Sequence, residues 1–197
     1  MNEAISVFGG LLAIGAMVPY IRDTLKGKTK PNVVSWFTWT LLTSIGAFAA
    51  FSEGAYTTAI FSAASALATL SIVILSFWYG VKRFTRFDVW CQIAALVGVV
   101  LWQLTSDASV AIAIVVIVDI IAALPTIRHS WLSPNAETWS TFAVSALGAL
   151  VTLFTITQMS FAAFAYPIWL TFGNAGIAAV IVYRRRMVSL GDQPKVG

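Results

Sequence analysis

Seven long apolar runs, separated by short polar segments, constrain how this chain of 197 residues can fold. A helix needs roughly 20 apolar residues to cross a bilayer, where it satisfies its own backbone hydrogen bonds. The runs lie at residues 4–21, 33–51, 56–79, 89–104, 109–127, 137–156 and 161–183. Because 59% of the residues are hydrophobic and 10% are charged, no separate soluble domain fits between them. The sequence predicts an all-α integral membrane protein, a single membrane domain over residues 1–197 with seven transmembrane helices.

The basic residues indicate how these helices are oriented. Short loops rich in Lys and Arg stay on the cytoplasmic side of a membrane. All 12 basic residues lie in the first, third and fifth loops and the C-terminal tail: Arg22, Lys26, Lys28, Lys30, Lys82, Arg83, Arg86, Arg128, Arg184, Arg185, Arg186 and Lys195. The pattern predicts an N-terminus outside and a cytoplasmic C-terminus. We expect a protein of a bacterial inner (plasma) membrane, with anionic lipids beside these loops.

Residue counts exclude several kinds of chemistry. Cys91 is the sole cysteine and His129, next to Arg128 in a predicted loop, the sole histidine, so no disulfide, thiolate cluster or two-imidazole site can form. We therefore expect no metal and no cofactor. All lysines lie in loops or the tail, where none can form a retinal Schiff base. The intramembrane polar residues supply no nucleophile–base pair, which argues against an enzyme, and scattered basic loops argue against nucleic-acid binding.

The second half of the chain repeats two short motifs of the first half. P-x-I-R occurs at residues 19–22 and 125–128, and P-N-x-x-[S/T]-W-x-T follows at 31–38 and 134–141. Self-similarity of this kind indicates repeated helical units. The alignment of these motifs relates the two halves of the chain residue by residue.

We expect two three-helix repeats, residues 4–79 and 109–183, joined by a linker helix at 89–104. A repeat with an odd number of helices would emerge inverted if it were joined directly to its copy, and one extra helix restores its orientation. The sequence thus predicts parallel repeats, related by a pseudo-two-fold axis along the membrane normal. A substrate site in such a protein lies near the midplane between the repeats.

This three-plus-one-plus-three plan, with a proline near the cytoplasmic end of the first and fifth helices, resembles the SWEET and PQ-loop (MtN3-like) superfamily of transporters. Tyr20 and Thr126 stand where the family name implies glutamine. The resemblance implies alternating access, with the prolines as hinges and a pocket between the second, third, sixth and seventh helices. The expected function is transport of a small polar solute, a sugar or similar, without direct use of ATP.

Two pairs of repeated residues are candidates for a hinge and gate. Proline within a helix removes a backbone hydrogen bond, so Pro19 and Pro125 give each repeat a flexible point; alternatively, each ends its helix. Trp36 and Trp139 are also duplicated. Their depth favours packing at the cytoplasmic interface or at an inner gate over contact with substrate.

Four polar residues are candidates for substrate binding. A polar amide at the centre of a membrane helix is costly unless it faces protein or water, and Asn174 is the best candidate; alternatively, it ties helices together. Its place also resembles that of a pocket asparagine in SWEET proteins, and the resemblance implies Gln158 as a second ligand. The repeat offset leads from Asn174 to Ser71. The hydroxyls of Ser62, Ser65 and Thr69 form a different stripe on that helix, so the face toward the pathway stays open.

Asp119 is the one carboxylate well inside a predicted span. An unpaired charge there costs on the order of 3 kcal/mol on insertion scales. Proton coupling or recognition of a substrate amine is one interpretation, and a buried, hydrogen-bonded carboxyl is the other. Ala13 occupies the equivalent place in the first repeat, so any such role is asymmetric. Tyr166 and Trp169 on the seventh helix are equally consistent with packing against lipid.

A receptor or scaffold of the same fold is the alternative function. It would bind a peptide or partner protein without transport, at a cytoplasmic surface around Lys26, Lys28, Lys30 and Arg184 to Arg186. Membrane topology and anionic lipids explain the same charges. The sequence is compatible with a homo-oligomer, although seven helices can enclose a pathway alone.

Overall fold

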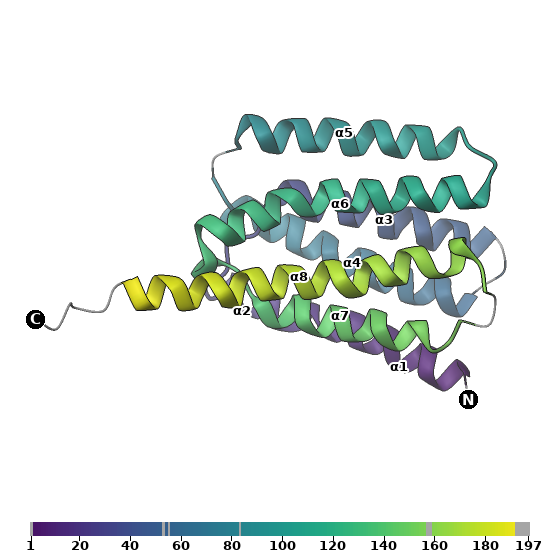
Figure 1. The fold of residues 1–197 in the computed structure, drawn as a ribbon, viewed down its shortest axis with the longest axis horizontal. Helices are drawn as coiled ribbons and strands as arrows, with labels where there is room; N and C mark the ends of the chain where they lie inside the picture. The colour runs from purple at the N-terminus through teal and green to yellow at the C-terminus, as the bar shows by residue number, and fades with distance from the viewer. Residues whose placement is uncertain (1, 53, 55, 83, 157–158, 192–197) are drawn as a thin grey trace, which may run out of the picture.

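The computed structural model describes residues 2–52, 54, 56–82, 84–156 and 159–191, and this part of the chain is helical without any β-strand. The helices lie side by side as a bundle of roughly parallel rods (Figure 1). They are α1 (Asn2–Gly15), α2 (Met17–Leu25), α3 (Val33–Ser52), α4 (Tyr56–Tyr79), α5 (Arg86–Gln103), α6 (Ala108–Leu132), the 3-10 turn η1 (Pro134–Ala136), α7 (Trp139–Leu153) and α8 (Phe161–Gly191).

Four of the described helices are long and apolar enough to cross a membrane. These segments are Val33–Phe51, Ala59–Tyr79, Ser109–Leu132 and Ala163–Ser189. The apolar helix α7 is shorter. The prediction of an all-helical protein with membrane-compatible helices is confirmed at this level, and the count of seven spans and their orientation stay predictions.

The two P-x-I-R motifs fold differently. The first predicted span is interrupted: α1 ends at Gly15 and α2 begins at Met17. Pro19 has no N–H to donate to the carbonyl of Gly15, which explains an interruption at this point. By contrast, α6 continues through Pro125 to Leu132. The predicted loop position of His129 is therefore wrong, because this half-buried residue lies in the last turns of α6.

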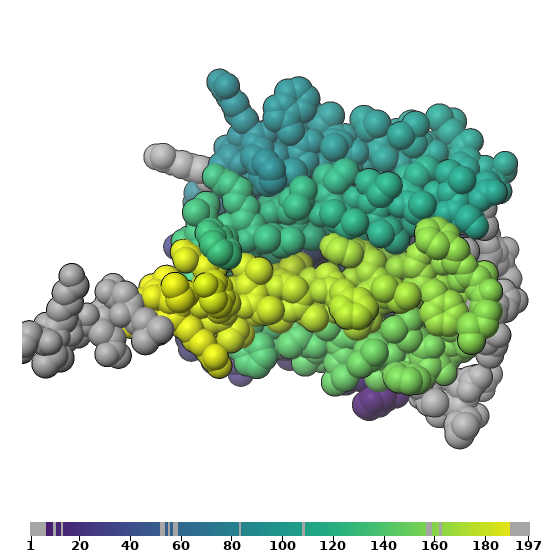
Figure 2. Space-filling model, viewed as in Figure 1, coloured from purple at the N-terminus to yellow at the C-terminus, as the bar shows by residue number. Residues whose placement is uncertain are grey.

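The helices pack in two groups with α5 outside them. In the first group α4 contacts α1, α2 and α3, and in the second group α8 contacts α6 and α7. Between the groups, α1 packs against α7 and α3 packs against α6. Helix α5 lies at one edge of the bundle, against α6 and α3 (Figures 1 and 2). Gly98 permits this close approach, because a Cβ atom there would lie 2.3 Å from Cγ2 of Val118.

Much of the outer surface is apolar. Large side chains such as those of Phe48, Leu104 and Phe154 are exposed. An apolar surface this extensive is unusual for a soluble monomer and fits contact with lipid.

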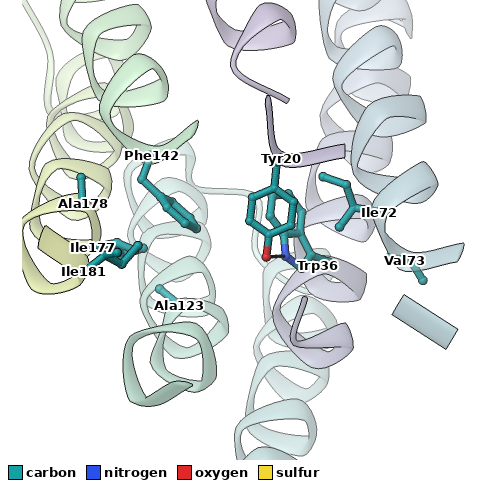
Figure 3. Packing of buried hydrophobic residues seen from close by; sticks show 9 residues of the cluster. All are labelled: Tyr20, Trp36, Ile72, Val73, Ala123, Phe142, Ile177, Ala178 and Ile181. Carbon is teal, nitrogen blue, oxygen red and sulfur yellow. Dashed lines mark hydrogen bonds between the residues drawn. The ribbon is translucent and has the colours of Figure 1, made fainter. Parts of the chain in front are cut away.

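The described residues of three connections, 26–32, 80–82 with 84–85, and 133–138, lie at one end of the bundle, which we call the basic end (Figure 1). A buried core lies near this end (Figure 3). It consists of Tyr20, Trp36, Ile72, Val73, Ala123, Phe142, Ile177, Ala178 and Ile181. Tyr20 packs on Trp36 with 4.6 Å between ring centroids and meets Phe142 edge-on at 6.3 Å. The core therefore joins the two groups of helices.

Candidate functional site

A cavity of about 290 Å³ lies at the centre of the bundle. Helices of both groups line it. Its polar and aromatic lining residues include Trp36, Trp39, Thr43, Phe61, Ser62, Ser65, Thr69, Asp119, Thr141, Phe142, Ser145, Thr152, Tyr166, Trp169 and Asn174. This combination of aromatic walls with a few polar groups is typical of sites for small molecules.

The cavity is not centred along the helices. Toward the basic end it stops at Trp36, Thr141 and Ile177, beside the buried core. Toward the opposite end it reaches Thr152 in the last turn of α7 and Tyr166 in the second turn of α8. The protein is therefore closed at the basic end, with its cavity extended toward the other end.

Asp119 supplies the one carboxyl group among the described residues that line this cavity. The residue is 5% exposed, and its Oδ2 accepts a hydrogen bond of 2.5 Å from Nε1 of Trp169. The hydrogen-bonding groups of Trp39 and Tyr166 face the same carboxyl. Among the described residues that line the cavity there is no Lys, Arg or His. The carboxyl is thus held by neutral donors without a neighbouring cation.

Gly173 gives the Trp169 indole its position. It follows Trp169 by about one helical turn on α8, so its side-chain site is covered by the indole. A Cβ atom at Gly173 would lie 2.9 Å from two ring atoms of Trp169. The glycine leaves room for the ring along the helix, in the orientation that directs Nε1 to Asp119.

The predicted ligand Asn174 lines the same cavity. Its Nδ2 donates one hydrogen to the carbonyl of Leu170 at 2.8 Å, so its side-chain oxygen and its second N–H hydrogen are left for a solute.

The structure separates the predicted ligand Ser71 from this site. Ser71 is exposed, its hydroxyl donates to Leu67 of its own helix at 2.8 Å, and it does not line the cavity. The stripe formed by Ser62, Ser65 and Thr69 faces the cavity instead. Gln158 lies outside the described residues.

Glu137 closes the basic end, a role that the sequence did not reveal. The prediction placed it in the sixth span, but α7 begins at Trp139 and leaves Glu137 in the preceding connection, 1% exposed. Tyr20 donates its hydroxyl hydrogen to Oε2 of Glu137 at 2.9 Å, and Nε1 of Trp36 donates to the Tyr20 hydroxyl at 3.1 Å. Burial raises the pKa of Glu137 to about 8, against the opposing effects of the Tyr20 hydrogen bond and the Arg185 charge.

Further hydrogen bonds join the two groups of helices at the same end. The hydroxyls of Thr29 and Thr138 lie 2.5 Å apart, and the Thr138 hydroxyl donates to Asp23 at 3.3 Å. Arg185 at the end of α8 donates to the carbonyls of Pro134 at 3.0 Å and of Glu137. The connection before α7 is thereby tied to both α2 and α8. The one sequence signal for this closure was Glu137, an acidic residue between the repeated Asn and Trp of the second motif.

The duplicated tryptophans and prolines do not occupy equivalent surroundings. Trp36 is 1% exposed and forms the floor of the cavity, whereas Trp139 is 44% exposed. Pro19 is half-buried in the first turn of α2, and Pro125 is buried within α6. A gate position thus fits Trp36, and Trp139 lies at the surface.

Comparison of the chain with protein-family models, with curated proteins and with solved structures gave no match. The resemblance to the SWEET and PQ-loop superfamily therefore stays a prediction from the two repeated motifs and the order of helices. In the described part of the chain, no group of three or more His, Cys, Asp or Glu side chains is placed to hold a metal ion.

Proposed function

We propose that this protein is a membrane transporter that moves a small polar solute by alternating access. The observation that carries the proposal is the central cavity, which contains Asp119 and Asn174 and is closed at the basic end. Its volume of about 290 Å³ is near the lower limit of ligand pockets, roughly 300 Å³. It therefore suits one small molecule.

Two parallel three-helix repeats form the moving parts in this proposal, residues 4–79 and 109–183, with the linker helix at 89–104. In each group the third helix packs against the first and the second. Across the groups, α1 meets α7 and α3 meets α6, which is the exchange that a two-fold axis would generate. Trp39 and Phe142 occupy equivalent positions when the second repeated motif is aligned. Their rings pack together with 6.4 Å between the centroids.

Alternating access requires the basic end to open while the opposite end closes. In the proposed orientation the basic end is cytoplasmic, and the structure represents an outward-facing state. Opening separates Tyr20 from Glu137 and Thr29 from Thr138. Pro19 precedes Tyr20 in α2 and Pro125 lies within α6, and at each proline a missing backbone hydrogen bond makes bending less costly.

Uptake by proteoliposomes of a panel of labelled small solutes tests the transport activity. Saturable uptake of at least one solute is expected. Its absence for every solute, beside a functional reference transporter, contradicts the proposal. Partner capture that depends on Lys26, Lys28 and Lys30, without solute flux, would favour the receptor.

A disulfide across the basic end tests the mechanism. Thr29→Cys with Thr138→Cys, in a Cys91→Ala background, places two thiols where the hydroxyls lie 2.5 Å apart. Oxidation should stop uptake, and reduction should restore it. Each single cysteine variant is the control, since it should be insensitive to oxidant. Undiminished uptake by the disulfide-linked protein contradicts alternating access.

A further inference from the structure

Three threonine hydroxyls that line the cavity share a chemical property. The hydroxyls of Thr43, Thr69 and Thr152 donate to backbone carbonyls of their own helices at 2.8, 3.0 and 3.1 Å. The amide of Asn174 donates one of its two hydrogens to Leu170 at 2.8 Å and keeps the other. Because the single hydrogen of each threonine hydroxyl is engaged, these three groups present lone pairs to the cavity. Their oxygens favour a solute that donates hydrogen bonds.

Asp119 adds a formal charge to these acceptors. Neutral N–H and O–H donors favour the ionised carboxylate but do not cancel its charge. No Lys, Arg or His lies among the described lining residues, so a bound cation would supply the positive charge that this carboxylate lacks. Thr141, 1% exposed, contributes a further hydroxyl oxygen without a hydrogen-bond partner.

Aromatic rings surround the same carboxyl. Trp39, Tyr166 and Trp169 all line the cavity with Asp119. The faces of such rings attract ammonium groups, most strongly where water is excluded. Acceptors, a carboxylate and aromatic rings are the three features that recognise an amine.

We propose that the solute is a small organic cation, a protonated or quaternary amine, bound by Asp119 between Trp39, Tyr166 and Trp169. This inference rests on the proposed transport function and narrows its substrate class. A neutral sugar would bring no positive charge to the Asp119 carboxyl, so it is a poorer match for this site.

Solute-induced currents of the full-length protein in liposomes on a solid-supported membrane test the charge directly. The probes are choline, agmatine and 3,3-dimethyl-1-butanol, the uncharged carbon analogue of choline, with glucose as a second neutral solute. At least one cation should give a saturable current, and both neutral probes should give none. Entrapped pyranine should report no acidification during the cation current.

Variants at Asp119 and Gly173 then locate the site. Asp119→Asn should raise the half-saturating cation concentration about 30-fold or more, as expected when one partner of a buried charge pair is removed. Asp119→Glu, which keeps the charge, should retain the preference for cations. Gly173→Ala displaces the Trp169 ring and should weaken cation binding severalfold, while chromatography confirms that each variant is folded.

The outcomes separate this inference from transport itself. Flux of a neutral solute with acidification that depends on Asp119 means proton coupling; transport stands and the cation proposal fails. Flux of a neutral solute that is unchanged by Asp119→Asn also overturns the cation proposal. So does flux of a cation that is unchanged by this substitution. If no solute of either class moves, the proposed function fails as well.

Discussion

The two segments that share the P-x-I-R and P-N-x-x-[S/T]-W-x-T motifs perform different tasks. In the first, Tyr20 and Trp36 are buried and bonded to each other across the basic end. In the second, Thr126 is buried without a hydrogen-bond partner and Trp139 is largely at the surface. The second segment instead supplies Glu137, where the repeat offset gives Val34 in the first.

This difference shows that the duplicated motifs form one composite closure. The aromatic residues come from one segment and the carboxyl that they bond comes from the other. The cavity is equally one-sided, because Asp119 corresponds to Ala13. The shared motifs thus adopt different local structures, and the residues that differ between them supply the chemistry.

The largest effect should come from the tryptophans. Trp36→Ala removes a fully buried ring and should destabilise the protein by about 3–5 kcal/mol. Trp139→Ala, the matched control, removes a ring that is 44% exposed and should cost far less. Thermal stability followed by size-exclusion chromatography measures both. Equal losses of stability in the two variants would contradict the different surroundings of Trp36 and Trp139.

Glu137, in the second segment, should make the stability of the protein depend on pH. Because folding raises the pKa of Glu137 from 4.5 to about 8, unfolding releases a proton between these values. The contribution of Glu137 to the free energy of unfolding is therefore fully present below pH 4.5. It falls as the pH rises toward 8, by at most about 1.4 kcal/mol per pH unit. Melting temperatures of the native protein and Glu137→Gln should diverge over this window. Parallel pH profiles would contradict a buried, protonated Glu137.

Substitutions at the equivalent residues Tyr20 and Thr126 should differ less in their effect on the free energy of unfolding. Tyr20→Phe leaves the Trp36 donor and a Glu137 oxygen unpaired, at a cost of about 1–3 kcal/mol. Thr126→Val deletes a hydroxyl that has no partner and should be neutral or slightly stabilising. Unfolding midpoints compare the two variants. A larger loss for Thr126→Val would show that its hydroxyl has a partner after all.

The smallest effect on stability is expected at the prolines. Pro125→Ala allows a backbone hydrogen bond within the continuous helix α6, a gain of about 1 kcal/mol. Pro19→Ala should gain less because the helix is already interrupted at Ala16. If Pro125 acts as a hinge, its variant should also transport more slowly. Faster transport by Pro125→Ala, at unchanged expression, would contradict that role.

The helix positions could be predicted from the sequence because short polar segments separate the apolar runs. The run at 56–79 coincides with α4, and that at 33–51 differs from α3 by one residue. The interruption of the first helix at Ala16 could not be predicted from the sequence, since Pro19 and Pro125 lie in the same local motif. The two prolines differ in the structure around them.

The site was harder to predict because these helices are apolar on all sides. Without an apolar stripe, the sequence does not show which face turns inward. Asp119 and Asn174 stood out as rare intramembrane polar residues. Trp169 and Tyr166 did not, since an aromatic ring fits lipid as well as a cavity. Ser71 was chosen by offset alone, and its helix turns a different face to the cavity.

The 15 residues of α7 have a consequence for the surrounding bilayer. At 1.5 Å per residue this helix extends roughly 22 Å, less than a hydrocarbon core of about 30 Å. Its neighbour α8 has 31 residues and is long enough to exceed that thickness. If α7 crosses a bilayer, as the sequence predicts, the lipids beside it would have to compress to match its length, at a cost that increases with acyl-chain length. Membrane thickness would then act on the side of the protein where α1 and α7 meet.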